Sequence, residues 1–140
     1  MLCAVGLGVS AYLSYAHYAD GDVLACPDSA TVNCAKVTSS SQSEVFGVLP
    51  VADLGVAYFV VMLALCLPSA WHSSAPLLHR ARLAGAGLGV GMVIYLLYAE
   101  LFQIHAICLY CTAVHVVAVL LFTIVVFAET GRSLASRSEG

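Results

Sequence analysis

The sequence predicts an all-α membrane protein, a bundle of four transmembrane helices with a long outer loop between the first two. Of its 140 residues, 61% are hydrophobic and 9% are charged, and the mean hydropathy is +0.97. Soluble domains usually carry about 25% charged residues, so this chain has too few to cover a water-facing surface. It contains four long apolar stretches and no basic patch, which excludes a nucleic-acid-binding protein.

The four apolar stretches define the predicted spans, at residues 1–18, 49–67, 83–104 and 106–128. A spanning helix needs roughly 20 apolar residues, which the last three stretches provide. The first is short and leaves open a native start upstream of Met1. A cleaved signal peptide is the alternative for this stretch, disfavoured by its missing basic start. We expect residues 1–128 to form one membrane domain, and Gly131 to uncouple a polar tail at 129–140 from the last helix.

The basic residues indicate the orientation in the membrane. Lys36 lies in the loop at 19–48 that joins the first two spans. The other four basic residues lie in the turn at 68–82 or in the tail, and are Arg80, Arg82, Arg132 and Arg137. The positive-inside rule places this turn and the tail in the cytoplasm. The long loop and the junction of the third and fourth spans then share the outer side.

This topology sorts the six cysteines into two groups. Cys3 and Cys66 fall near the cytoplasmic ends of the first two spans, where thiol buffers keep such residues reduced. They are interpreted as small buried hydrophobic residues without a role. Four cysteines fall on the outer, oxidising side and are the candidate catalytic residues: Cys26, Cys34, Cys108 and Cys111.

Cys108 and Cys111 form a Cys-x-x-Cys pair at the start of the fourth helix, close enough to bridge. Backbone N–H groups and the helix dipole at that end stabilise a thiolate, which is the nucleophile of disulfide exchange. The other pair, Cys26 and Cys34, is separated by seven residues. A short surface helix within 29–37 is expected to carry Cys34, so that one cysteine faces outward while the other faces the bundle and meets Cys108.

Two other interpretations of the four outer cysteines remain open. They could form two static disulfides in a non-catalytic membrane protein. They could instead hold zinc, although zinc ligands usually come as two tight pairs and Cys-x7-Cys is a poor match, so no metal is expected. Haem attachment needs a histidine directly after the Cys-x-x-Cys pair, where this chain has Thr112.

Several motifs together carry a resemblance to a known family. They are, in chain order, the Cys26-x7-Cys34 pair, Val37, Ser40, Leu-Pro-Val-Ala-Asp-Leu-Gly at 49–55, Tyr95-Leu96, Glu100 and Ile-Cys-Leu-Tyr-Cys at 107–111. Over residues 5–128 the chain resembles the vitamin K epoxide reductase family, whose members are four-span bundles. Its spans rich in Ala, Gly and Val resemble the bacterial branch, which implies a bacterial cell membrane, here without a fused thioredoxin domain.

The resemblance implies a route for electrons. In the family, the loop pair takes electrons from a thioredoxin-fold thiol protein, which here would be a separate partner on the outer side. The Cys-x-x-Cys pair then passes them to a membrane quinone such as ubiquinone, menaquinone or phylloquinone (vitamin K). Carried onto this chain, Cys26 would face the partner and Cys34 would form a transient disulfide with Cys108. Cys111 would face the quinone, and Ser40 matches a serine beside the loop pair.

Two positions depart from the animal enzymes of this family. Val51 stands where the animal reductase has a quinone-contacting Asn, and His115 stands where it has a Tyr. Simple quinone reduction is therefore favoured, and vitamin K epoxide reduction of the animal type remains the alternative. A DsbB-type oxidase also has four spans and two outer pairs, but its Cys-x-x-Cys pair comes first, the reverse of the order here.

Three ionisable residues lie at membrane depth, namely Asp53, Glu100 and His115. A charged residue at the centre of a span costs roughly 2.5–3.5 kcal/mol, so such residues are functional candidates. We expect all three near the outer mouth of the bundle, where they could relay the protons that quinone reduction needs. The alternative is structural: Asp53 caps a half-helix after Pro50, or Asp53 and Glu100 are shallow enough to be solvated.

Overall fold

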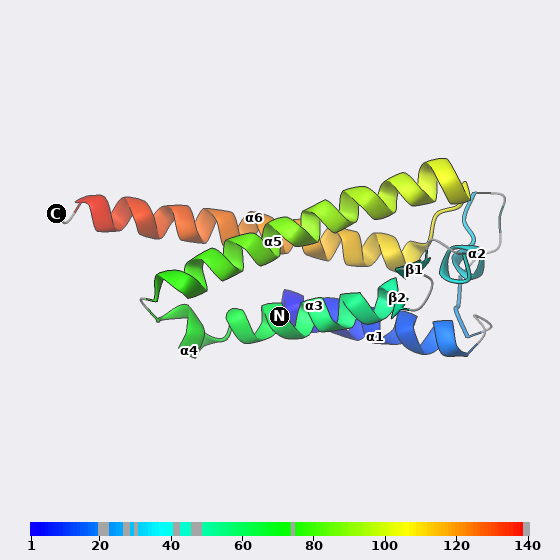
Figure 1. Ribbon diagram of the computed structural model, residues 1–140, viewed down its shortest axis with the longest axis horizontal. Coiled ribbons are helices and arrows are strands. Elements are labelled where there is room, and N and C mark those ends of the chain that lie inside the picture. The colour runs from blue at the N-terminus through cyan, green and yellow to red at the C-terminus, as the bar shows by residue number, and fades with distance from the viewer. Residues whose placement is uncertain are drawn as a thin grey trace.

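The computed structural model describes residues 1–19, 23–26, 29, 31–40, 43–45, 49–73 and 75–138. Its long helices are α1 (Leu2–Tyr18), α3 (Val51–Leu65), α5 (Pro76–Tyr98), which continues as the π-helix η2 (Ala99–Ile104), and α6 (Leu109–Ser138) (Figure 1). Between them lie the short helices α2 (Cys34–Thr38) and α4 (Pro68–Trp71), and the strands β1 (Glu44–Val45) and β2 (Leu49–Pro50), which pair antiparallel.

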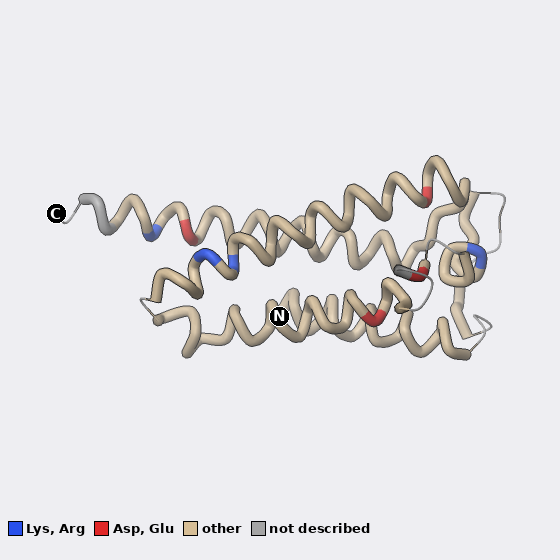
Figure 2. Tube along the Cα trace, viewed as in Figure 1, with Lys and Arg blue, Asp and Glu red and all other residues tan. Residues whose placement is uncertain are grey.

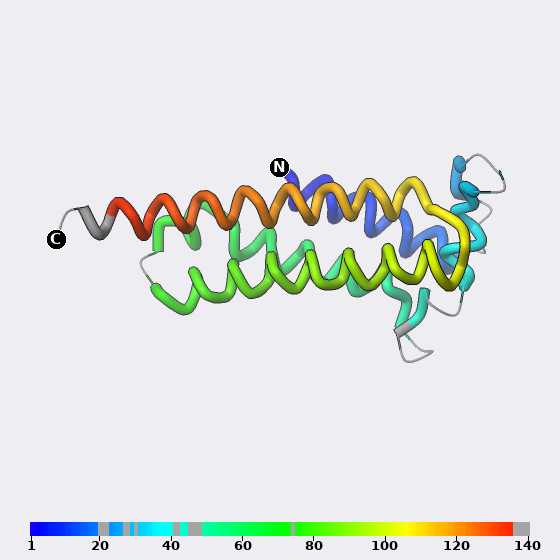
Figure 3. Tube along the Cα trace, turned by 90° about the horizontal axis from the view of Figure 1, so that it is seen from above, coloured from blue at the N-terminus to red at the C-terminus, as the bar shows by residue number. Residues whose placement is uncertain are grey.

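The four long helices form a bundle around a shared core. α1 packs against α3 and α6, and α5 packs against α6 and α3. Seen from above, α5 and α6 make one layer, with α3 beneath α5 and α1 beneath α6 (Figure 3). The core is a cluster of buried side chains from all four helices that includes Cys3, Phe59, Ala86 and Leu121. This arrangement confirms the all-α fold class.

Two helical segments are long and apolar enough to cross a membrane, Pro76–Ile104 with 29 residues and Leu109–Ala135 with 27. Both correspond to predicted spans. α3 is apolar but has 15 residues, and at about 1.5 Å per residue it is shorter than a hydrocarbon core of about 30 Å. The count of four spans therefore stays a prediction.

The predicted turn at 68–82 is wrong, because two helices begin within it. Pro68 occupies the start of α4 and Pro76 the start of α5. Proline is favoured there, since its fixed φ suits a helix and its missing N–H has no intrahelical role. Arg80 and Arg82 therefore lie on α5, and Arg82 is completely buried.

The prediction that Gly131 uncouples a separate tail is also wrong, because α6 runs on to Ser138. An exposed glycine in a helix costs only about 1 kcal/mol relative to alanine. The next residue, Arg132, lies over the ring of Trp71 at 4.7 Å and within 3.8 Å of Glu129. These contacts hold the helical turn around Gly131 against α4.

Candidate functional site

The Cys-x-x-Cys pair lies where α6 begins. The helix starts at Leu109, three residues later than predicted, so Cys108 directly precedes it and Cys111 lies in its first turn. The Thr112 amide donates to the Cys108 carbonyl at 2.9 Å, which closes the first helical hydrogen bond. The Cys111 amide donates to the Cys108 sulfur at 3.3 Å. The pair therefore has the predicted place at a helix N-terminus, and both cysteines are free thiols.

Contacts within this pair favour the thiolate of Cys108. A hydrogen bond from the Cys111 thiol lowers the pKa of the Cys108 thiol from its usual value of 9.0, and burial opposes this shift. Since Cys108 is the stronger acid, Cys111 keeps the proton that the two share. The arrangement therefore makes Cys108 the better nucleophile and leaving group.

The loop cysteines form a disulfide, Cys26–Cys34, with their Cα atoms 6.1 Å apart. Cys34 is fully buried at the first residue of α2, whereas Cys26 is partly exposed. The predicted helix within 29–37 begins later than expected, because the Asn33 side chain accepts a hydrogen bond from the Lys36 amide at 2.7 Å and caps α2 there. Cys34 therefore lies inside the protein, whereas Cys26 lies partly at its surface.

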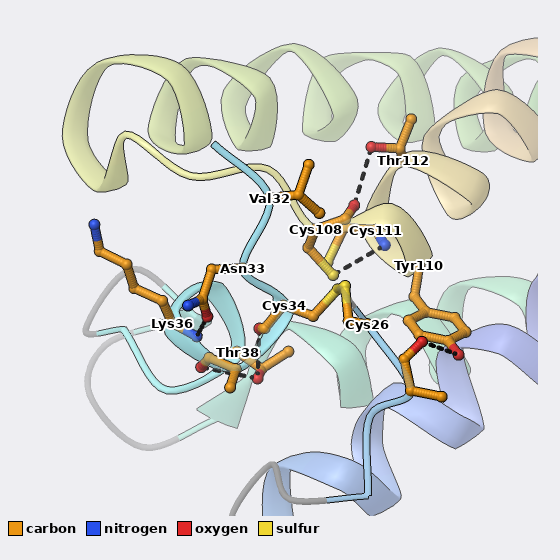
Figure 4. The surroundings of a disulfide bond; sticks show 12 residues. Cys26, Val32, Asn33, Cys34, Lys36, Thr38, Cys108, Tyr110, Cys111 and Thr112 are labelled. Atoms are coloured by element: carbon orange, nitrogen blue, oxygen red, sulfur yellow. Dashed lines mark hydrogen bonds between the residues drawn. A yellow bond between two sulfur atoms is a disulfide. The ribbon is translucent and has the colours of Figure 1, made fainter. Parts of the chain in front are cut away.

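A backbone bridge holds the two cysteine pairs together. The Ile107 amide donates to the Thr31 carbonyl at 2.9 Å, and the Ile107 carbonyl accepts from the Asn33 amide at 3.2 Å. Cys34 directly follows Asn33, and Cys108 directly follows Ile107. The bridge therefore brings Cys34 beside Cys108. Both belong to one buried cluster, and Figure 4 shows the Cys108 sulfur pointing toward the loop disulfide.

Below the Cys-x-x-Cys pair, the four long helices line a cavity of about 700 Å³. Its wall is mainly apolar. Of the residues predicted from the sequence, five line it: Ser40, Val51, Glu100, Cys111 and His115. The structure thus brings the inner cysteine of the pair and four of the five predicted pocket residues to one space.

Asp53 is the predicted pocket residue that lies elsewhere. Its carboxylate accepts hydrogen bonds from Ser14 and from Tyr18, the latter at 2.8 Å, so it ties α3 to α1. Asp53 is not part of the cavity wall. Its structural interpretation is therefore favoured, through a helix–helix contact that the sequence did not indicate.

Buried polar atoms in the cavity wall lack partners. Oε2 of Glu100, both ring nitrogens of His115 and the hydroxyl of Tyr58 make no hydrogen bond within the described part of the chain. An unsatisfied buried group costs roughly 1–3 kcal/mol, so these atoms suit a bound molecule that carries polar atoms. A quinone fits, since its ring is flat and apolar and its carbonyl oxygens accept hydrogen bonds from an imidazole N–H or a neutral carboxyl.

A zinc site does not fit the outer cysteines, because the Cys26–Cys34 disulfide removes two of the four ligands it would need. Over the residues that the structure describes, no three His, Cys, Asp or Glu side chains come close enough to hold a metal ion.

Cys3 and Cys66 form another thiol pair, which the sequence spacing did not reveal. Their thiols are hydrogen-bonded to each other, and both pack in the core cluster of the bundle. The residues are far apart in the chain and meet only because α1 packs against α3. No local signal could have paired them.

Comparison with known proteins identifies the family. The sequence model of the vitamin K epoxide reductase family matches residues 1–126. A search of curated proteins finds no match. The matched range contains both cysteine pairs and the whole cavity wall. The chain therefore belongs to the vitamin K epoxide reductase family, and is a membrane oxidoreductase with a role in thiol–disulfide and quinone chemistry.

Proposed function

We propose that this protein is a quinone-dependent oxidoreductase that generates disulfides in a separate thioredoxin-fold thiol protein. One observation carries the proposal: a backbone bridge holds the buried Cys34 beside Cys108, directly above a cavity that Cys111 lines. Two purely structural disulfides would not need the loop pair to lie beside the Cys-x-x-Cys pair, or the Cys-x-x-Cys pair to line a cavity.

The proposed cycle balances two electrons. A partner thiolate attacks Cys26 and releases Cys34 as a thiolate, and the second partner thiol then displaces Cys26, which leaves a disulfide in the partner. Cys34 attacks Cys108 of the oxidised Cys-x-x-Cys pair and releases Cys111. Cys26 then resolves this mixed disulfide and frees Cys108. The cysteine states seen here, an oxidised loop pair above two free thiols, match the stage that follows.

In that stage, Cys108 and Cys111 lose two electrons and close to a disulfide. A membrane quinone supplies the acceptor chemistry, taking up two electrons and two protons. His115 and Glu100 hold their unpartnered atoms toward the cavity, where they can orient carbonyl oxygens or give up protons. Val51 offers no hydrogen bond at the mouth, so we favour a plain quinone (ubiquinone, menaquinone or phylloquinone) over an epoxide.

For topology, we propose four spans within a single domain at 1–128, in a bacterial cell membrane, with the cysteine pairs on the outer side and the polar end of α6, within 129–140, in the cytoplasm. Charge supports this orientation. The arginines on α5 and α6 lie at the end of the bundle away from α2 (Figure 2), as the positive-inside rule requires.

The test is quinone reduction by the purified protein with a reduced thioredoxin-fold donor. Cys111→Ser should abolish turnover, whereas Cys66→Ser, outside the proposed electron route, should retain it. In cells that lack quinones, alkylation should trap Cys108 and Cys111 in the reduced state. If Cys111→Ser turns over normally, or thiol states do not respond to quinone loss, the proposal is wrong and a structural role for the disulfides is favoured.

A further inference from the structure

We propose that Glu100 is a proton carrier between a small pocket beside the outer loop and the membrane cavity, with His105 and Thr31 forming its entrance. This inference rests on the proposed function, because it concerns the protons that accompany electron transfer in the same cavity. It adds a route and an entrance, neither of which the cysteine pairs define.

Glu100 forms part of two separate cavities. The first is the large cavity that Cys111 and His115 line. The second is a pocket of about 210 Å³, whose wall consists of Thr31, Glu100, Leu101, His105, Ala106 and Ile107. Among the described residues, Glu100 is common to both walls. Since His105 is exposed, the small pocket reaches the aqueous surface beside the loop.

The backbone turns widely around Glu100. The π-helix η2 widens the last turn of this span, and the Glu100 carbonyl accepts hydrogen bonds from the amides of His105 and Ala106, the latter at 3.2 Å. His105 has a φ of 52°, a left-handed conformation that is uncommon for residues other than glycine. Such π-helical turns and backbone strain concentrate at functional sites. Here they surround Glu100, whose side chain is buried.

The surroundings of Glu100 suit a group that gains and loses a proton. The groups that face it are the amide of Cys108 and the thiols of Cys108 and Cys111, and His17 and His115 line the same large cavity. Neither cavity has a Lys or Arg in its described wall. Burying a carboxylate without a cation is costly, so the neutral acid is the resting form that this site favours.

Reduction of a quinone needs one proton more than the Cys-x-x-Cys pair holds, and Glu100 can supply it. With Cys108 as the thiolate and Cys111 as the thiol, the reactive pair holds one proton, whereas a quinone needs two protons to become a hydroquinone. The second proton must enter the cavity from outside the pair. Glu100 gives up its proton to the cavity and regains one from water through the small pocket. The proton lost to water when Cys108 ionises is thereby returned, and the overall exchange stays neutral.

Infrared spectroscopy of the purified full-length protein tests the route without turnover. The wild-type protein should show a carboxylic acid band that is lost in Glu100→Gln. This band should shift when H₂O is replaced by D₂O, because the proton exchanges with water. Thr31→Val and His105→Asn should slow the shift, since both alter the small pocket; Asn tolerates the left-handed backbone at 105. Gln103→Asn, on the same turn but outside either wall, is the control.

The outcomes separate this inference from the proposed function. Cys111→Ser should lose quinone reduction but keep the band and its exchange. The inference is overturned if no band depends on Glu100, if the band does not shift in D₂O, or if the pocket variants exchange as fast as the control. In turnover, Glu100→Gln should lower the rate of quinone reduction by about 10²-fold, while thiol exchange between the loop pair and its partner stays unchanged.

Discussion

Removal of Glu129 should be the most destabilising single change in the half of the bundle away from the Cys-x-x-Cys pair. Arg82 is completely buried, and it donates to Glu129 at 2.5 Å and to the carbonyls of Leu65 at 3.0 Å and Ala70 at 2.6 Å. Glu129→Leu introduces an apolar side chain that also favours a helix, but it leaves the Arg82 guanidinium without its counter-charge. Leaving one partner of a buried ion pair uncompensated costs about 3–5 kcal/mol.

The loss of stability in Glu129→Leu depends on the ion pair between Arg82 and Glu129, and a double substitution tests this dependence. Arg82→Met combined with Glu129→Leu removes both charges, and replacing a buried pair with apolar residues is often neutral or stabilising by about 1–4 kcal/mol. Some of that gain is offset, because Arg82 also lies over the ring of Trp71 at 4.6 Å, a contact worth about 0.5–2 kcal/mol. The double variant should therefore be clearly more stable than Glu129→Leu alone.

Trp71 offers the assay, since it is the single tryptophan of the chain and contacts Arg82 directly. Its fluorescence, followed during unfolding of the detergent-solubilised protein, reports on this part of the bundle. If Glu129→Leu unfolds at the same denaturant concentration as the wild-type protein, or if the double variant is as unstable as the single one, the reasoning from a buried, mutually dependent pair is refuted.

Single substitutions elsewhere in the bundle test three other features: the packing at Gly6, the Cys108–Cys111 hydrogen bond and the role of His115. Gly6→Ala should destabilise the protein by about 1–3 kcal/mol through overpacking, because its Cβ would collide with the buried phenyl ring of Phe59 on α3. Gly8→Ala, with open space around it, is the control in the same unfolding experiment. In a pH titration of ultraviolet thiolate absorbance, Cys108 should ionise below its usual pKa of 9.0. Cys111→Ala removes the hydrogen bond that stabilises the thiolate, so the transition should move to higher pH, and an unmoved transition would contradict this cause. His115→Leu should slow quinone reduction by about 10²-fold, and unchanged turnover would rule out a proton relay through this residue.

The helices and the position of the Cys-x-x-Cys pair at a helix start could be predicted from local sequence. Apolar runs define α1, α3, α5 and α6 because a membrane bundle must cover long hydrophobic stretches. The position of Cys108 at a helix start follows from the Cys-x-x-Cys pair and the apolar run after it. The predicted start of α6 is wrong because the apolar run begins before the helix does. The chain makes a left-handed turn at His105, so α6 begins only at Leu109. A glycine would have indicated such a turn in the sequence, but this position has none.

The meeting of the two cysteine pairs could not be predicted from spacing alone. It depends on hydrogen bonds between Thr31, Asn33 and Ile107, segments that are far apart in the chain. Asp53 and Glu100 also looked equivalent, as acids near the outer ends of their spans. They differ in which neighbour each one meets, since Asp53 finds hydroxyl donors on α1 whereas Glu100 turns toward the cavity.

Two glutamates are buried in the part of the chain that the structure describes, Glu100 and Glu129, and they differ in the partners that their carboxylates have. Glu129 is satisfied by Arg82 and contacts His79 as well, so its removal should cost stability and leave the chemistry of the distant pairs Cys26–Cys34 and Cys108–Cys111 intact. Glu100 is as deeply buried, yet one of its oxygens has no described partner, and its carboxyl group lies near the thiols of Cys108 and Cys111. Glu100→Gln should therefore do the opposite, with little change in the free energy of unfolding and a slower reaction. If both variants fall in stability alone, Glu100 is a structural residue whose partner has been missed, and the proton route through η2 is wrong.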